Sequence, residues 1–109
     1  MAAKKNLDKI ILHKARKYLR LVEKEGIKVD RAYIYGSWAK HTQKEWSDID
    51  IAIISRTFSG QKTRYWDILL PLVKEVDWRI EPMPFTPKRF IDENPLVWEI
   101  KKTGKRIKP

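Results

Sequence analysis

The chain has 109 residues, of which 42% are hydrophobic and 35% charged, a balance typical of a soluble globular protein with one domain over residues 1–109. It contains no cysteine, which excludes disulfides, thiolate catalysis and cysteine-rich zinc sites, and no apolar run approaches the ~20 residues that cross a bilayer. Lysine and arginine number 24 against 14 aspartate and glutamate, and the formal charge of +10 favours phosphate-bearing or acidic partners without distinguishing an enzyme from a binding module.

The first third of the chain predicts a helix followed by a strand. Apolar residues recur at helical spacing over residues 7–25, and Gly26 is a natural C-terminal stop. Because this amphipathic pattern follows the basic start directly, in place of the apolar stretch of a secretory signal, we expect a cytoplasmic protein without membrane attachment. Residues 29–35 are β-branched and aromatic and end at Gly36-Ser37, so they predict a strand that enters a tight turn.

The middle of the chain predicts a second, central strand and a second helix. Residues 37–43 suit a short helix or a turn, and residues 47–54 predict a strand whose far end is apolar on both faces, as in a strand inside a sheet. Residues 65–76 carry another helical stripe. Pro71 removes one helix hydrogen bond there, so we expect a kink or a restart of the helix.

The next segment predicts a third strand. Residues 77–81 alternate polar and apolar side chains, which places Asp77, Arg79 and Glu81 on one polar face. That face would carry two carboxylates.

The end of the chain predicts a connector and a short closing helix. Pro82, Pro84 and Pro87 predict a stiff connector, and residues 95–102 predict a helix that Gly104 closes. Together these elements predict an α/β (α+β) domain with a small mixed β-sheet, the carboxylates on one face and the helices packed on the other.

Asp48 and Asp50 are the first candidates for chemistry. They lie two residues apart in a predicted strand, so both carboxylates project from the same face. Close carboxylates repel, and the arrangement is stable chiefly when a cation lies between them. Oxygen-rich sites of this kind select Mg²⁺, which keeps water and substrate phosphate as its remaining ligands.

A phosphate-binding segment is predicted upstream of these aspartates. Gly36 lets the chain turn and approach a ligand, the backbone N–H groups at Ser37 suit a phosphate, and Lys40 adds a positive charge. A phosphate cradle followed by two metal-binding carboxylates is what in-line nucleotidyl transfer requires, with one metal activating the attacking oxygen and a second stabilising the leaving pyrophosphate. Each pair of residues alone is common in turns and strands, so the prediction depends on their order and spacing.

The spacing itself resembles a known signature. Gly36-Ser37, ten residues and Asp48-Ile49-Asp50 resemble the Gly-Ser-x10-Asp-x-Asp motif of the DNA polymerase β-like nucleotidyltransferases, and the chain length is similar to that of the minimal nucleotidyltransferases. The resemblance implies the polymerase β-like fold, Mg²⁺ on the two aspartates, a triphosphate at the Gly-Ser turn and a third carboxylate on a later strand. His41 departs from it, since many relatives have glycine there.

Two residues compete for the third carboxylate. Asp77 is the first candidate, because it heads a Val-Asp-Trp sequence that resembles the family's usual Val-Asp-Leu. Glu81, on the same predicted face, is the second. An arrangement in which one carboxylate binds metal and the other orients Arg79 also stays open.

The motif does not name the acceptor. Minimal nucleotidyltransferases similar to this chain often pair with a small all-helical protein, the higher eukaryotes and prokaryotes nucleotide-binding (HEPN) domain, as antitoxins that transfer AMP from ATP to a tyrosine of the toxin. We therefore expect ATP and a HEPN-type partner. The rival hypothesis is a non-catalytic basic module that binds nucleotides or nucleic acid. The aspartates disfavour it, because without a metal they would repel phosphate.

Overall fold

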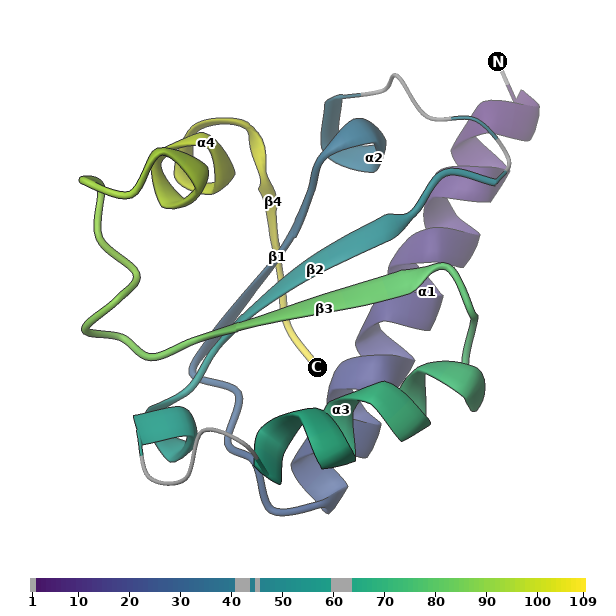
Figure 1. The fold of residues 1–109 in the computed structure, drawn as a ribbon. Helices are drawn as coiled ribbons and strands as arrows, with labels where there is room; N and C mark the ends of the chain where they lie inside the picture. Colours follow the sequence, from purple (N-terminus) through teal and green to yellow (C-terminus); the bar gives the residue numbers. More distant parts are fainter. Residues whose placement is uncertain (1, 41–43, 45, 60–63) are drawn as a thin grey trace.

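The computed structural model describes residues 2–40, 44, 46–59 and 64–109, and Figure 1 shows their arrangement. None of the described helices is long and apolar enough to cross a bilayer. In chain order they are α1 (Ala2–Lys24), α2 (Ser37–Lys40), the 3-10 helix η1 (Arg56–Ser59), α3 (Arg64–Lys74) and α4 (Pro95–Thr103).

Four strands form one mixed sheet in the order β3-β2-β1-β4. Strand β1 pairs antiparallel with β2 and with β4, and β2 pairs parallel with β3. Strand β2 is therefore an inner strand, as its apolar sequence predicted. Strand β4 was not predicted, because three residues with two basic side chains carry no readable alternation. The strands are β1 (Arg31–Tyr35), β2 (Ile49–Ile54), β3 (Ile80–Phe85) and β4 (Lys105–Ile107).

The mixed sheet with packed helices confirms the predicted fold class, but the helices lie on both faces. Helices α1 and α3 cover one face of the sheet (Figure 1). On that face Ile49, Ile51 and Ile53 of β2 are fully buried. Helix α4 covers one end of the other face, where it packs against Ala52 and Ile54. Because β2 is apolar on both faces after Asp50, both faces need a helix to exclude water.

The predicted end of α1 is confirmed. Gly26 has a φ of +92°, a conformation that glycine adopts without a side-chain clash. Its N–H donates to the Glu23 carbonyl at 3.0 Å, and the Ile27 N–H donates to the Val22 carbonyl at 3.4 Å. These two bonds form a Schellman motif, which satisfies carbonyl groups at the end of the helix.

Helix α3 continues through Pro71, so the predicted restart is wrong. Pro71 and Asp67, whose carbonyl loses its helix partner, are both exposed, and water can satisfy that carbonyl. Tertiary packing also holds this helix, because the buried Tyr18 hydroxyl donates to the Leu69 carbonyl at 2.7 Å.

The predicted proline connector is also wrong for two of its prolines, since Pro82 and Pro84 lie inside strand β3. The Ile49 N–H donates to the Arg79 carbonyl at 2.8 Å, and the Ser55 N–H donates to the Phe85 carbonyl at 3.0 Å. Odd-numbered residues of this segment therefore face β2, and the two proline nitrogens face the open edge. No bond of the β2–β3 ladder is lost, which is why an edge strand tolerates these prolines.

Candidate functional site

The turn between β1 and α2 brings the backbone of Gly36 against the Asp50 carboxylate. Gly36 has a φ of +76°, and a Cβ at this position would collide with Oδ2 of Asp50. The Lys40 N–H donates to the Gly36 carbonyl at 3.1 Å and closes the short helix α2. Glycine is thus required here both for the backbone conformation and for the close approach to β2.

Strand pairing gathers acidic side chains on the face opposite α1 and α3. Asp50 is in register with Glu81 of β3 on one side and with Tyr35 of β1 on the other. Neighbouring strands lie about 4.8 Å apart, so paired residues on one face are direct neighbours. Asp48 immediately precedes β2 and has the same side-chain parity as Asp50. We call Asp48, Asp50 and Glu81 the acidic triad.

The triad is electrostatically unfavourable as it stands. Burial, followed by the negative charges of Glu81 and Asp48, raises the pKa of Asp50 to about 6. Burial also raises the pKa of Glu81, together with the charge of Asp48 and a side-chain hydrogen bond to it. Two carboxyl groups can share such a bond only through a proton. The three side chains therefore lack a positive charge between them.

Asp77 lies outside the triad, because strand β3 begins only at Ile80. Its Oδ2 accepts from Lys14 Nζ at 2.7 Å and from an Arg79 guanidinium nitrogen at 2.8 Å. Its Oδ1 accepts from the Arg79 N–H at 2.9 Å and from Arg79 Nε at 3.0 Å. These bonds, led by those from the Arg79 side chain, hold the pKa of the Asp77 carboxyl far below its usual range. The prediction that Asp77 and Glu81 share one strand face is therefore wrong, and Asp77 instead joins α1 to the α3–β3 turn.

The other residues predicted to bind phosphate lie around α2. Ser37 is the first residue of α2 and is half-buried. Lys40 is exposed at the end of that helix and forms an ion pair with Glu99 of α4. His41 lies outside the described residues.

Trp38 of α2, next to the Gly36 turn, is a core residue. Its side chain is buried, and its Nε1 donates to the Ser47 carbonyl at 3.3 Å. This bond attaches α2 to the segment that leads into Asp48.

Tyr35 is a neighbour of the triad that the sequence did not reveal. Its partly buried ring lies next to Asp50 in the sheet, and burial, followed by the charges of Asp50 and Glu81, raises the pKa of its hydroxyl to about 12. The hydroxyl therefore stays protonated and able to donate at neutral pH. Only the β1–β2 register identifies this residue, and a long connection between two strands does not encode their register.

The donor set of the triad suits a hard divalent cation, although its side chains are not yet gathered around one point. Among the described residues, no three His, Asp or Glu side chains form a ready metal-binding group. The triad nevertheless offers only carboxylate oxygens, and Asp48 and Glu81 are exposed and free to reorient. Such ligands, with room for water and phosphate, fit Mg²⁺.

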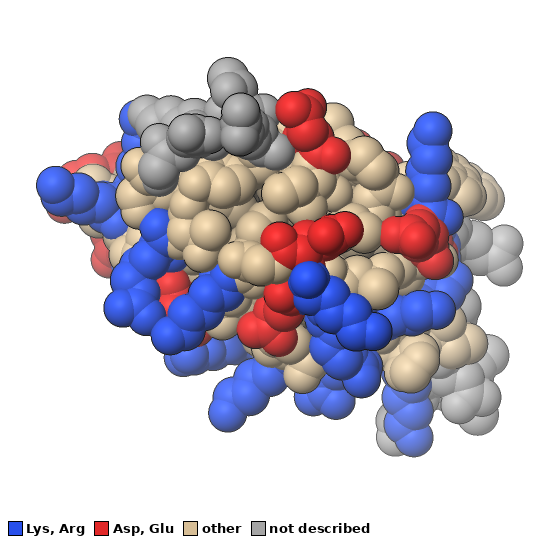
Figure 2. Space-filling view, turned by 90° about the horizontal axis from the view of Figure 1, so that it is seen from below, with Lys and Arg blue, Asp and Glu red and all other residues tan. Residues whose placement is uncertain are grey.

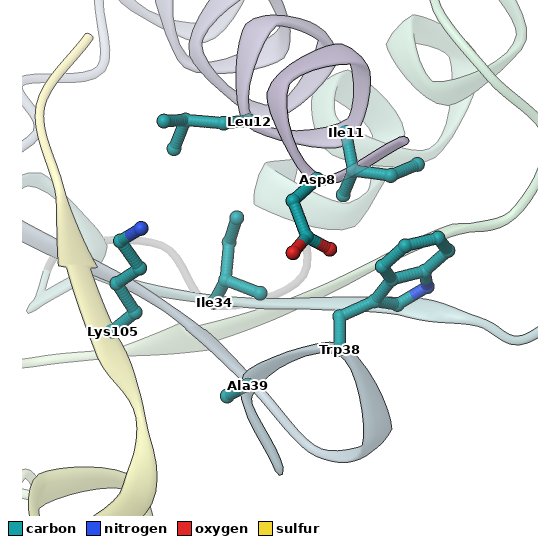
Figure 3. A pocket seen from close by; sticks show the side chains of 7 residues that line it. All are labelled: Asp8, Ile11, Leu12, Ile34, Trp38, Ala39 and Lys105. Carbon is teal, nitrogen blue, oxygen red and sulfur yellow. The ribbon is translucent and has the colours of Figure 1, made fainter. Parts of the chain in front are cut away.

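The cavity shown in Figure 3 lies away from the acidic triad. The Asp8 carboxylate points into it from α1, and Trp38 lines it from α2. It lies on the face of the sheet that α1 covers, next to Ile34 and Lys105, whereas the triad lies on the opposite face. Its volume of about 90 Å³ is also below the roughly 300–1,000 Å³ of small-molecule sites.

Comparison with known proteins assigns the family. No curated protein matches the sequence. The family model described as "Polymerase beta, Nucleotidyltransferase" matches residues 13–108, a span that contains the Gly36 turn, the acidic triad and every strand of the sheet. Since this match covers most of the chain and agrees with the mixed sheet, the protein belongs to the polymerase β nucleotidyltransferase family.

Proposed function

We propose that the protein transfers the nucleoside monophosphate of ATP to a hydroxyl acceptor in a Mg²⁺-dependent reaction that releases pyrophosphate. The observation that carries this proposal is the acidic triad, whose mutual repulsion a divalent cation would relieve, next to the Gly36 turn. Family membership supports nucleotidyl transfer in general. ATP, Mg²⁺ and the acceptor are our more specific inferences.

We assign the third carboxylate to Glu81 in place of Asp77. Glu81 is in register with Asp50 on the open part of the sheet. Asp77 already accepts hydrogen bonds from Lys14 and Arg79, and its side chain is only 6% exposed. A carboxylate that is neutralised inside the protein has little charge left for a metal.

Each side chain then has a role that follows from its position. Asp48, Asp50 and Glu81 would hold Mg²⁺, which when bound supplies positive charge that offsets the triphosphate and favours ionisation of the acceptor hydroxyl. Glu81, on the edge strand, faces the side from which an acceptor can approach. The new bond joins the acceptor oxygen to the α-phosphorus as the bond to pyrophosphate breaks, and the hydroxyl proton passes to a carboxylate oxygen.

Gly36, Ser37 and Lys40 would hold the β- and γ-phosphates. The backbone N–H groups of α2 supply donors, and Lys40 supplies a charge. In the present structure Lys40 pairs with Glu99, so a triphosphate must compete with that carboxylate for the ammonium group.

We infer that the acceptor is a protein, namely a tyrosine of a helical HEPN-domain toxin, which would make this chain its antitoxin. The inference is supported by the resemblance to minimal nucleotidyltransferases and by the charge of +10, which favours an acidic partner.

The competing hypothesis is a basic module that only binds nucleotides or nucleic acid. Figure 2 shows the face of the molecule seen from below, where Lys and Arg side chains spread over the lower half and Asp and Glu side chains lie among them. An unbroken basic surface, which polyanion binding favours, is not present on the described part of this face.

Label transfer tests the enzyme hypothesis. The protein is incubated with Mg²⁺ and ATP labelled in the α-phosphate, with and without a HEPN-domain protein from the same genome. We expect label on the acceptor, and we expect Asp48→Asn and Asp50→Asn to abolish it. Asp92→Asn, which changes an exposed carboxylate beside α4, is the matched control and should retain transfer. Transfer that survives both triad substitutions would reject the hypothesis.

A nucleotide titration separates the two hypotheses further. An enzyme of the proposed kind binds ATP more tightly when Mg²⁺ is added, and Asp48→Asn removes that gain. Nucleotide binding that ignores Mg²⁺ but weakens steeply with salt would favour the basic module.

A further inference from the structure

An open apolar groove lies between α3 and the edge strand β3. Its volume is about 580 Å³, and its lining includes Trp66, Leu70 and Lys74 of α3, Trp78 of the α3–β3 turn, and Glu81 and Met83 of β3. Trp78 is 72% exposed and Leu70 is 53% exposed. Exposed apolar groups that gather in one groove mark a surface that a partner covers, and tryptophan is among the residues most enriched in such surfaces.

The helix side of the groove forms one stripe. Trp66, Leu70 and Lys74 follow each other at intervals of four residues, so their side chains lie on one face of α3. The neighbouring stripe, with Leu69, is buried against the core. Helix α3 thus has one apolar face for its own core and a second one that the described residues leave exposed.

The strand side of the groove determines what kind of partner fits. Strand β3 is at the edge of the sheet, where an added strand would normally pair with free N–H and C=O groups. The outward-facing nitrogens of Pro82 and Pro84 carry no hydrogen, so this edge cannot donate at those two positions. A partner must therefore dock through side chains, and an amphipathic helix laid in the groove does so.

Charge selects between a second copy of this chain and another protein. Lys74 lines the groove, and each copy of the chain carries a formal charge of +10, so two copies repel each other. The same positive charge attracts a helix that carries acidic residues beside its apolar face. Glu81 lines the groove at the edge of the sheet and also belongs to the acidic triad, so a partner seated in the groove lies beside the proposed site.

We propose that this groove binds an amphipathic helix of an acidic protein partner and so presents that partner to the carboxylate face. The inference rests on the proposed function for the identity of the partner. The docking itself does not require nucleotide, metal or transfer.

The test measures the affinity of the full chain for a purified HEPN-domain protein from the same genome by titration calorimetry. We expect Trp78→Ser and Leu70→Glu each to raise Kd at least about 10-fold, with Leu70→Lys less harmful because it adds a favourable charge. Both positions are exposed, and unchanged melting curves would verify that the three variants fold. Trp98→Ser, at a 50% exposed tryptophan on α4 away from the groove, is the matched control and should leave Kd within about 2-fold.

Several outcomes would overturn the inference. The inference fails if the two groove variants bind like the parent, if the parent does not bind the helical protein, or if the chain forms a dimer that Trp78→Ser dissociates. Asp48→Asn should bind the partner normally. Tight binding that depends on the groove but yields no label transfer would support the docking and reject the proposed reaction. Label transfer together with groove variants that bind the partner as tightly as the parent would support the reaction and reject the docking.

Discussion

Asp50 and Asp77 are chemically identical, yet their surroundings shift their pKa values in opposite directions. Asp77 accepts hydrogen bonds from Lys14 and Arg79, which hold its pKa far below the usual range. Asp50 has carboxylate neighbours in place of cations, and burial together with those charges raises its pKa to about 6. The negative charge of Asp77 is thus balanced by cations within the protein, whereas that of Asp50 is not.

This contrast separates a structural site from a candidate functional one. A neutralised carboxylate stabilises the fold, because its charge interacts favourably only in the native state. A group of carboxylates that repel one another lowers stability, and such a group is typical of a functional site where a bound ligand offsets the repulsion. We therefore expect substitutions in the acidic triad to lower activity without lowering stability. We expect substitutions around Asp77 to lower stability while activity is retained.

The largest expected effect is on catalysis. Glu81→Gln should lower the rate of label transfer by about 100-fold or more without lowering the melting temperature, because it removes a proposed metal ligand and also removes repulsion within the triad. Initial rates at saturating Mg²⁺ measure this effect. Asp77→Asn should retain transfer at a temperature where it remains folded. The reverse pattern would make Asp77 the third carboxylate.

The second effect is on stability. Asp77→Asn should lower the free energy of unfolding by about 2–3 kcal/mol at pH 7, because it leaves Arg79, 14% exposed, beside a neutral amide. Since the folded pKa of Asp77 is lowered, its stabilising contribution is present at neutral pH and is lost as the pH falls below about 4. Urea unfolding of the parent and of Asp77→Asn at pH 7 and pH 3 measures the loss of stability and its dependence on pH. Lys14→Met should cost less, and an Asn variant as stable as the parent would contradict the structural role.

The third effect concerns the crowding around Asp50. Gly36→Ala should cost about 2 kcal/mol, since it combines a strained φ with a collision against Asp50 Oδ2. Gly26→Ala is the matched control, because it has a similar positive φ but open space around the added methyl group, and should cost about 1 kcal/mol. In an Asp50→Ala background the excess cost of Gly36→Ala should disappear. An unchanged excess in that double-mutant cycle would reject the collision.

The smallest effect is the pH dependence of stability near Asp50. Because its folded pKa is raised, the folded state binds the proton more tightly, so stability in Mg²⁺-free buffer should fall as the pH rises from about 4 to about 6. The change should be on the order of 1 kcal/mol, since the site is partly screened by solvent. Asp50→Asn should reduce this slope to the contribution of Glu81, whose pKa is also raised, and Asp92→Asn should keep the slope of the parent. Urea titrations in chelator across this range would detect the difference, and equal slopes would contradict it.

Local rules were sufficient for the parts of this protein that depend on neighbouring residues. Gly26 ends α1 because the residue after a helix often needs a positive φ, which glycine adopts easily. The residues after Asp50 are apolar on both strand faces, which predicts a strand that is covered on both sides. The order of Gly36, Ser37, Asp48 and Asp50 identified the candidate site for the same reason. The Gly-Ser turn and the alternation of side chains along one strand are local features, which do not depend on the rest of the chain.

Tertiary structure decided everything that depends on which strand pairs with which. The alternation over residues 77–81 could not show that β3 begins only at Ile80, since that start is determined by parallel pairing with β2 and by the attachment of Asp77 to Lys14 of α1. The same pairing placed Pro82 and Pro84 in an edge strand and Glu81 beside Asp50. The sequence by itself determined two of the three clustered carboxylates, and strand register, which depends on contacts between distant segments, selected the third.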